Sequence, residues 1–406
     1  MIKITALVIK LIIIVKVTII TFTIAGPADV RCCFGSTIAN NKLYIGGGAT
    51  GPVSTDEDTF SDDFFSLDLT VRFSTLSPPN MPYKECANIL IKSNAHTLVY
   101  AINKRGEGIY FFGGFRNEPR GNAIYVYSLE LNEWSPITPD GDQMPVESTT
   151  KIVGVTDNDL KTIYIFDNGT MYIYNAFENF LQISANFAPY KIYYYATVML
   201  NADEIAYIGG STSINETDRS SNIPMNQNAS GVPPQPRQGH SASMAIDGRI
   251  FIYGGFSGNE NADESIAISP MFAVLEYING EFMWSSPQLY GQLYQFRIYH
   301  NSHIFGNYLI VAFGRNLTKH RLNTIDLINI SDRNNYKVDT DYTPPGYVPP
   351  TPSSSASSGK GVIIPLILLG SVGFLVIVIG CTFFIRRRQH GNVVPNTFSL
   401  QKPMTC

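Results

Sequence analysis

The chain has 406 residues, with 29 lysines and arginines against 33 aspartates and glutamates, a net charge of −4. Five cysteines are too few for a scaffold built on disulfides, and a chain of this length can bury an ordinary hydrophobic core. The acidic balance does not suit nucleic acid or anionic lipid as a partner.

The first 25 residues have the composition of a secretory signal peptide. They contain Lys3, Lys10 and Lys16 but no acid, an apolar middle, and small residues that end near Ala25. An uncleaved membrane anchor is the alternative. Two of the lysines disfavour it, because a lysine near the centre of a spanning helix costs roughly 2.5–3.5 kcal/mol. We expect cleavage, which leaves residues 26–339 as a folded ectodomain.

Four short apolar runs, rich in aromatic residues, each end in a pair of glycines. These pairs are Gly46–Gly47, Gly113–Gly114, Gly209–Gly210 and Gly254–Gly255. Two weaker copies lie at Asp167 and Gly314, and successive copies are 42 to 67 residues apart. A period near fifty residues that is built from short strands is typical of a β-propeller.

The fifth copy shows the parts of one repeat. A strand leads to the hairpin turn Asp247–Gly248, and a second strand ends at the glycine pair. The glycines should take positive φ and allow a close approach of the backbone. A third strand, Met271–Ile278, and a fourth near Trp284 follow, and Trp134 matches in the second copy. Comparable aromatic positions in three other copies are Phe73, Phe180 and Tyr336.

These residues resemble the kelch repeat from roughly Cys32 to Val338, most closely in the second and fifth copies. The resemblance implies an all-β, kelch-type propeller with about six blades. Galactose oxidase has its catalytic domain in the same fold family, so a copper radical oxidase is the alternative function to be weighed.

The fourth copy lacks the residues for a complete blade. Residues 211–236 contain no aromatic residue and few large apolar ones, so they bury too little to order two strands. We expect the outer half of this blade to be missing and the whole segment to exchange its amide protons rapidly. Loss of an apolar strand pair from the gene model would give the same pattern.

The histidines follow the repeat, which favours packing over catalysis. His240 and His300 each lie 14 residues before a repeat glycine, Cys32 lies 14 before Gly46, and His96 holds the position with an insertion. His303 lies three residues after His300, and residues three apart on a strand point to opposite faces, which makes a poor metal site. We therefore expect no catalytic residue, metal or cofactor.

A galactose-oxidase-like copper site would need two tyrosines, two histidines and a tyrosine cross-linked to a cysteine. Cys86 is the only cysteine of the expected ectodomain that lies away from the N-terminus, and Tyr83 is merely adjacent to it. No complete set can be assigned, so the enzyme is the less favoured interpretation.

The C-terminal region predicts a membrane anchor. Residues 340–361 form a Pro/Ser-rich stalk, and residues 362–385 are an uncharged apolar stretch. At about 1.5 Å per residue this stretch forms roughly 36 Å of helix, enough to cross a core of about 30 Å. Arg386–Arg388 begin the tail 386–406 and place it in the cytoplasm by the positive-inside rule.

The secretory route raises the question of disulfides and glycans. Cys32, Cys33 and Cys86 lie outside the membrane, and we expect Cys86 to pair with one of the two neighbours, with Cys33 preferred. The Asn-x-Ser/Thr acceptors are Asn168, Asn215, Asn228, Asn316 and Asn329. Asn215 and Asn228, in a polar loop, are the best candidates.

The sequence thus predicts a type I single-pass membrane protein, at the cell surface or in the secretory pathway, that presents the propeller as a binding module. Residues 26–361 hold 22 basic and 33 acidic side chains, a net charge of −11. Loops 49–62, 115–122 and 256–269 suit a protein or glycan ligand. A passive adhesive protein is a third possibility, and the sequence names no ligand.

Overall fold

The computed structural model describes residues 29–51, 59–78, 81–116, 121–148, 151–185, 192–201, 204–212, 225, 229–257, 266–279, 281–291 and 296–348. The expected signal peptide, most of the stalk, the apolar stretch 362–385 and the tail lie outside these ranges, as do Asn215 and Asn228. Within them the regular elements are β-strands. The described part of the chain contains no helix that is long and apolar enough to cross a membrane.

Six antiparallel sheets follow one another along the chain, and we call them blades one to six. Blade one contains β2 (Gly35–Ala39), β3 (Lys42–Gly46), β6 (Phe64–Asp68) and β8 (Tyr83–Glu85). Blade two contains β10 (Thr97–Asn103), β11 (Gly106–Phe112), β13 (Ile124–Ser128) and β14 (Glu133–Ile137). Blade three contains β16 (Val153–Thr156), β17 (Thr162–Asp167), β18 (Thr170–Asn175) and β19 (Phe180–Ile183).

The second half of the chain repeats this plan with one exception. Among the described residues blade four has only β20 (Ala196–Asn201) and β21 (Glu204–Ile208). Blade five contains β23 (Ser241–Met244), β24 (Arg249–Tyr253), β27 (Phe272–Ile278) and β28 (Glu281–Ser285). Blade six contains β30 (Asn301–Phe305), β31 (Tyr308–Ala312), β32 (Ile325–Asn329) and β33 (Tyr336–Asp339).

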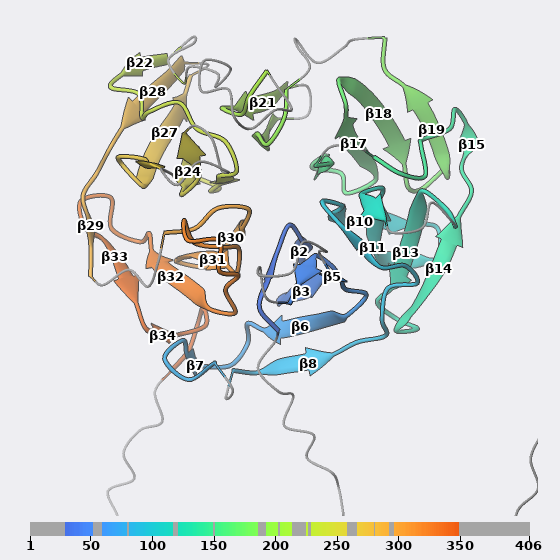
Figure 1. Cartoon of the computed structure of the whole chain (residues 1–406), viewed down its shortest axis with the longest axis horizontal. Coiled ribbons are helices and arrows are strands. Elements are labelled where there is room, and N and C mark those ends of the chain that lie inside the picture. The colour runs from blue at the N-terminus through green and yellow to red at the C-terminus, as the bar shows by residue number, and fades with distance from the viewer. Residues whose placement is uncertain are drawn as a thin grey trace, which may run out of the picture. The chain divides into compact units, whose positions relative to one another are not determined.

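The innermost strands close a ring. Each contacts the innermost strand of the next blade in the order β2, β10, β16, β20, β23 and β30, and β30 contacts β2 again. Figure 1 shows the blades arranged around a central axis. The arrangement is that of a β-propeller, as the repeat predicts.

Short strands at the outer edge join one blade to the next. Three of them pair in parallel with an outermost strand: β15 (Asp140–Gly141) with β19, β22 (Ala229–Gly231) with β28, and β29 (Leu289–Tyr290) with β33. The last strand, β34 (Asp341–Tyr342), pairs with β7 (Phe73–Ser74) next to blade one. The rings of Tyr342 and Phe73 stack with centroids 4.7 Å apart. This contact ties the end of the described chain to its beginning.

Another set of short strands lies where the chain enters and leaves the two inner strands of a blade. It comprises β1 (Arg31–Cys32) with β4 (Ala49–Thr50) and β5 (Thr59–Phe60), β9 (Ser93–Asn94) with β12 (Phe115–Arg116), and β25 (Phe256–Ser257) with β26 (Ile266–Ala267).

Aromatic side chains fill the spaces between blades. Phe64 of blade one lies 5.0 Å from Trp134 of blade two, measured between ring centroids. Phe272 of blade five lies 5.4 Å from Tyr336 of blade six. Phe180, which the repeat spacing matched to Trp134, does not pack in this way: it is 44% exposed, and the next residue, Leu181, is buried instead.

The glycine pairs occupy one structural position in the repeats, and this position corrects the first repeat. The paired φ values lie near 60° and 90° at Gly113–Gly114, Gly209–Gly210, Gly254–Gly255 and also Gly47–Gly48. Gly46 is instead the last residue of β3 and pairs with Gly35, so the sequence-based pair Gly46–Gly47 starts one residue too early. A Cβ on Gly254 would lie 2.3 Å from the carbonyl oxygen of Arg297, which excludes other residues there.

Part of the segment 211–236 is ordered, which corrects the expectation of a uniformly open loop. Ala229–Gly231 forms β22 and extends blade five, not blade four. Met225 is buried, and its carbonyl accepts a hydrogen bond of 2.5 Å from the indole N–H of Trp284. Residues 213–224 and 226–228 lie outside the described ranges.

Candidate functional site

The innermost strands surround a cavity of about 140 Å³ on the propeller axis. Each blade contributes polar side chains or backbone to its wall. One residue from each blade, in chain order, is Ser36, His96, Lys151, Thr197, His240 and His303. The described residues that line this cavity include no aspartate or glutamate. The centre of an otherwise acidic propeller is therefore lined by hydroxyl, imidazole and ammonium groups.

Lys151 is the cation of this cavity. It directly precedes Ile152, which packs against Gly113 of the previous blade, and this contact fixes where the lysine enters the channel. Among the described residues its ammonium group has neither a hydrogen-bond nor an ion-pair partner. Burial lowers the pKa of Lys151, and the nearby Cys33 thiol opposes that shift. Lys151 is partly buried, so its charge is incompletely solvated and an anion entering the cavity would be stabilised there.

Three histidines lie at the start of inner strands and pack between blades. Each histidine packs against the first glycine of the preceding blade's turn: His96 against Gly47, His240 against Gly209 and His300 against Gly254. A Cβ on any of these glycines would lie only 2.5 to 2.8 Å from Cε1 of the histidine. Burial lowers the pKa of His96 and His240 to about 3, so both are neutral near pH 7. Each histidine thus fills space that only glycine leaves open.

The same position in the first blade belongs to Phe34 and not to Cys32. Ser241 pairs with Tyr253 in blade five, so His240 lies opposite Gly254. In blade one Gly35 pairs with Gly46, so Phe34 lies opposite Gly47. The match with Cys32 was wrong for two reasons: the count began at Gly46 and not at Gly47, and the hairpin of blade one is one residue shorter than that of blade five, with 13 residues from Phe34 to Gly47 against 14 from His240 to Gly254.

Buried arginines three residues before this position hold the glycine turns. Arg31, Arg237 and Arg297 are all fully buried. Each donates from Nη1 to the carbonyl of the first turn residue, to Gly47, Gly254 and Phe313 at 2.9, 3.1 and 2.7 Å. The sequence shows this arginine before both His240 and His300, and the structure adds Arg31.

The histidines and cysteines do not assemble a copper radical site. His300 Nε2 lies 2.8 Å from the Ser241 hydroxyl, whereas His303 Nε2 lies 2.8 Å from that of Ser36. Among the described residues no three His, Cys, Asp or Glu side chains come together as metal ligands. The described residues around Cys86 include Tyr44 and Tyr127 but no histidine, so they do not fit the copper group of galactose oxidase.

A pair of thiols lies near this cavity. Cys32, Cys33 and Cys86 are all free, so the expected Cys33–Cys86 disulfide is not formed. Cys33 instead donates an S–H···S hydrogen bond of 3.4 Å to Cys32. Cys86 follows the outer strand β8, where its thiol faces the carbonyl of Lys84. Cysteine spacing could not show that Cys33 enters an inner strand while Cys86 leaves an outer one.

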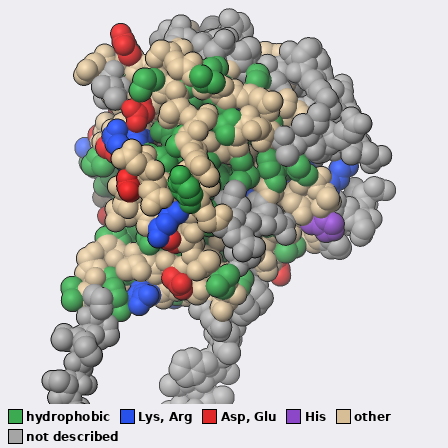
Figure 2. Space-filling model, turned by 90° about the vertical axis from the view of Figure 1, so that its left-hand side faces the viewer, with side chains coloured by type: hydrophobic (Ala, Val, Ile, Leu, Met, Phe, Trp, Pro, Cys, Tyr) green, Lys and Arg blue, Asp and Glu red, His purple; other side chains and the backbone are tan. Residues whose placement is uncertain are grey.

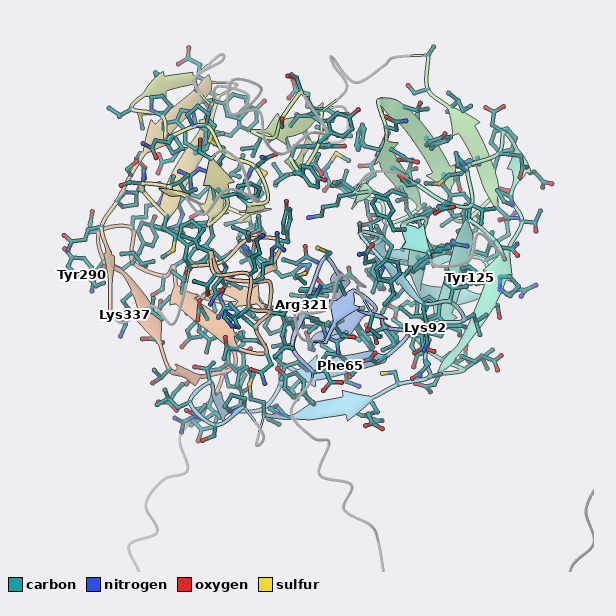
Figure 3. All side chains as sticks on the ribbon, viewed as in Figure 1. Phe65, Lys92, Tyr125, Tyr290, Arg321 and Lys337 are labelled. Atoms are coloured by element: carbon teal, nitrogen blue, oxygen red, sulfur yellow. The ribbon has the colours of Figure 1, made fainter. Side chains whose placement is uncertain are left out.

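Arginines gather beside this thiol pair. Arg321 donates two hydrogen bonds, to the carbonyls of Thr50 and Gly51 at 3.1 and 2.9 Å, and lies toward the centre of the view in Figure 3. The hydrogen bond from Cys33, together with the charges of Arg315 and Arg321, lowers the pKa of Cys32 to about 7 despite its burial.

The described glycan acceptors differ in accessibility. Asn168 is exposed in the turn between β17 and β18, with a φ of 48°. The Asn329 amide nitrogen donates to the Asp339 carboxylate at 3.0 Å, and the Asn316 side-chain oxygen accepts from Thr318 at 2.8 Å. Asn168 is therefore the most accessible of these three.

The outer surface carries no comparable concentration of charge on the face drawn in Figure 2. Acidic and basic side chains are interspersed there among apolar ones.

No family model matches the sequence, and no curated protein matches it. The structure is similar to a solved structure entitled "Structure of YjhT", a kelch-type β-propeller protein, with a TM-score of 0.54 and 16% sequence identity. The similarity covers 77% of this chain and 98% of the other. The fold is a kelch-like β-propeller. At this identity the similarity concerns the fold alone.

Proposed function

We propose that this protein is a binding module that holds an anionic group of its ligand in the central channel. The observation that carries the proposal is Lys151, a channel cation without a partner among described lining residues that include no carboxylate. The hydroxyl of Thr197 is buried there and has no hydrogen-bond partner either. An acidic glycan supplies a carboxylate or sulfate for the lysine and hydroxyl groups for the neighbouring polar side chains.

The test uses the full-length protein in detergent on an array of acidic glycans and their neutral counterparts. We expect saturable binding of an acidic glycan that Lys151→Met abolishes. Lys161→Met is the matched control, because Lys161 is exposed on the surface of the same blade. The proposal is contradicted if Lys151→Met leaves binding unchanged, or if no acidic glycan binds. Preferential binding of acidic peptides would show that the ligand is a protein and not a glycan.

We also propose that the module faces the outside of the cell or a secretory lumen, on a type I single-span anchor. The uncharged residues 362–385, followed by Arg386–Arg388, support this orientation. Protease added to intact cells should remove the propeller and leave a short membrane-bound C-terminal fragment. A tag fused at Cys406 that antibodies reach without permeabilisation would show the opposite orientation.

A further inference from the structure

Cys32 and Cys33 form a pair of adjacent thiols next to the channel. Their sulfur atoms lie 3.4 Å apart, and Cys32 is buried whereas Cys33 is partly exposed. A disulfide requires a sulfur–sulfur distance of about 2.05 Å, so the two sulfurs must still approach each other, and because adjacent Cα atoms lie only about 3.8 Å apart the bond closes a strained eight-membered ring that is readily reduced. Adjacent thiols seldom face each other in an extended strand, where neighbouring side chains point to opposite sides.

The fold imposes the backbone conformation that brings the two sulfurs together. Cys33 has a φ of 59°, and the residue two positions before the first residue of the inner strand has a similar conformation in four other blades, at Ala95, Tyr194, Gly239 and Tyr299. The Cys33 N–H donates to the carbonyl of Tyr299 at 3.1 Å, and its carbonyl accepts from the Ala95 N–H at 2.6 Å. Neighbouring blades therefore hold the Cys33 backbone from both sides, and the sulfur contact follows from the fold.

Positive charge surrounds the pair. The hydrogen bond from Cys33 and the charges of Arg315 and Arg321 lower the pKa of Cys32. The same hydrogen bond and burial raise the pKa of Cys33, which Arg315 and Lys151 oppose, so Cys32 is the thiolate of the pair. The thiolate is the reactive form of cysteine, and a nearby cation favours it. Cys86 differs, because burial raises the pKa of its thiol. Cys86 therefore serves as an internal control, because its thiol should react with peroxide more slowly than that of Cys32.

We propose that Cys32 and Cys33 are a redox-active pair that hydrogen peroxide closes into a vicinal disulfide. The Cys32 thiolate attacks one peroxide oxygen, the O–O bond breaks, and hydroxide leaves with a proton from solvent as water. The resulting sulfenic acid is attacked by the Cys33 sulfur, which gives up its proton. The S–O bond breaks, the S–S bond forms, and a second water leaves. Two thiols are oxidised by two electrons, and one peroxide is reduced to two waters.

Closure changes the charge beside the channel. A disulfide carries no negative charge, so oxidation removes the thiolate that faces Arg315 and Arg321. The small size of peroxide matters, because Cys32 is only 3% exposed and a larger oxidant has poor access to its sulfur. This inference rests on the thiol pair and its cations and does not depend on the ligand proposed above.

The experiment exposes the reduced full-length protein in detergent to increasing peroxide, alkylates it and analyses its peptides without reduction. We expect the peptide that contains Cys32 and Cys33 to lose the mass of two hydrogen atoms and to resist alkylation. Reduction should restore two alkylation sites. Cys86 should remain alkylatable throughout, and Cys86→Ser should leave closure unchanged.

The variant Cys33→Ser tests whether Cys33 is the thiol that resolves the sulfenic acid of Cys32. Without the second thiol, Cys32 should stop at a sulfenic acid that dimedone traps. If that variant does not fold, Cys86→Ser still decides between the alternatives, because it removes any disulfide that involves Cys86. A disulfide between Cys33 and Cys86, or two freely alkylated thiols at Cys32 and Cys33 after peroxide treatment, overturns the proposal.

Discussion

Blades four and five have equivalent inner hairpins, but their described outer parts differ. Both begin with a hairpin, β20–β21 or β23–β24, that ends in a glycine pair with φ near 60° and 90°. Blade five continues with β27 and β28, whereas the segment after blade four gives Met225 and β22 to blade five. Among the described residues, blade four keeps its place in the ring through its inner strand β20, which contacts β16 on one side and β23 on the other.

The largest expected effect comes from the glycine turns. Gly254→Ala places a Cβ 2.3 Å from the Arg297 carbonyl oxygen, whereas Gly209→Ala in blade four meets that of Arg237 at 2.8 Å. Each variant combines the strain of a left-handed backbone with the cost of overpacking. We therefore expect Gly254→Ala to lower the unfolding free energy by at least about 3 kcal/mol, and Gly209→Ala by less. Denaturant unfolding measures both.

Gly346→Ala is the matched control for these two variants. Gly346 has a φ of 74°, but no heavy atom lies within 4 Å of its added Cβ. It should lose only about 1–2 kcal/mol from left-handed strain. Equal destabilisation of Gly254→Ala and Gly346→Ala would show that the close approach of neighbouring blades contributes nothing.

Acid should weaken the interfaces on both sides of blade five. His240 packs against Gly209 of blade four, and His300 packs against Gly254 of blade five. Burial lowers the pKa of His240 from 6.5 to about 3, so the unfolded chain takes up its proton first as the pH falls. Stability should therefore be level above pH 6.5 and fall below it, by about 1.4 kcal/mol per pH unit for each such histidine.

The variant His240→Asn isolates one of these contributions. It costs packing at every pH, but its unfolding free energy should decline less steeply between pH 6.5 and 4 than that of the unaltered protein. At pH 5 the difference in pH-dependent loss should be about 2 kcal/mol. Parallel curves for the two proteins would mean that His240 titrates normally in the folded state.

The next effect tests whether the segment after blade four belongs to blade five. Trp284→Phe removes the hydrogen bond to the Met225 carbonyl, and Trp134→Phe removes the equivalent bond of 2.9 Å to Ala87. Trp284→Phe should cost about 1–2 kcal/mol, because the buried Met225 carbonyl loses its donor, and Trp134→Phe should cost less, because Ala87 is exposed and water can replace the donor. Only Trp284→Phe should accelerate amide exchange within Ala229–Gly231. Unchanged amide exchange in Ala229–Gly231 would show that the hydrogen bond of Trp284 does not stabilise β22.

Local patterns predicted the parts of the fold that repeat. The glycine turns after short strands and the hairpin at Asp247–Gly248 both correspond to features of the structure, whereas most of the fourth copy's outer segment lies outside the described residues. These features depend on neighbouring residues in the sequence, so spacing alone reveals them. The shift by one residue at Gly46 arose because three consecutive glycines hide the register of the strand.

The candidate site could not be predicted in the same way, because blades distant in the sequence assemble it. Lys151 is one lysine among many in the sequence, and only ring closure brings it near Cys33 and His300. The Cys32–Cys33 contact depends on a φ of 59° that neither cysteine favours by itself. The parallel pairing of β22 with β28 could not be predicted either, since edge pairing of this kind has no local sequence signal.

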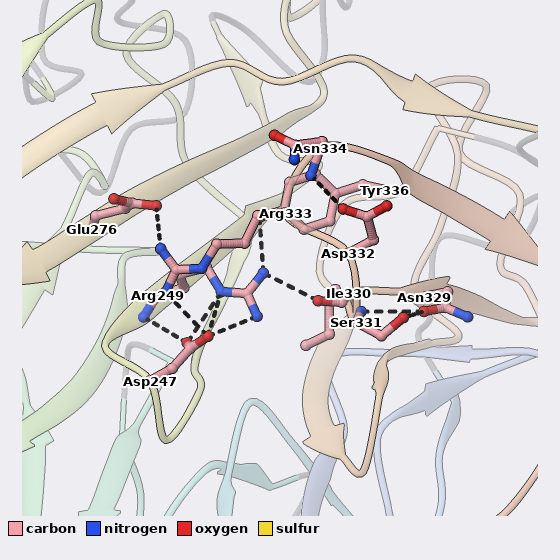
Figure 4. A network of polar contacts seen from close by, with 10 residues as sticks. All are labelled: Asp247, Arg249, Glu276, Asn329, Ile330, Ser331, Asp332, Arg333, Asn334 and Tyr336. Atoms are coloured by element: carbon pink, nitrogen blue, oxygen red, sulfur yellow. Dashed lines mark hydrogen bonds and ion pairs between the residues drawn. The ribbon is translucent and has the colours of Figure 1, made fainter.

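The smallest expected effect concerns the polar contacts on the outer sides of blade five. On the side of blade six, Asp247 accepts from Arg249 at 2.8 Å and from Arg333 at 3.3 Å, and Arg333 also contacts Glu276 (Figure 4). On the side of blade four, Tyr277 donates to Glu204 at 2.8 Å, but that contact is exposed. The network at Asp247 should therefore contribute more than the single hydrogen bond at Glu204.

Asp247→Asn should lower the unfolding free energy by a few tenths to about 1 kcal/mol, and high salt should reduce the difference by screening. Partial burial would raise the pKa of Asp247, but the Arg249 amide and the guanidinium groups of Arg249 and Arg333 hold it below its ordinary value of 3.8. Because the folded pKa is depressed, the contribution is complete at neutral pH and disappears as the pH falls through that value. Glu204→Gln, which keeps an acceptor for Tyr277, should leave the unfolding midpoint unchanged. A larger effect of Glu204→Gln than of Asp247→Asn would mean that the fourth blade is held from outside, by its contact with β27, and not by its inner hairpin.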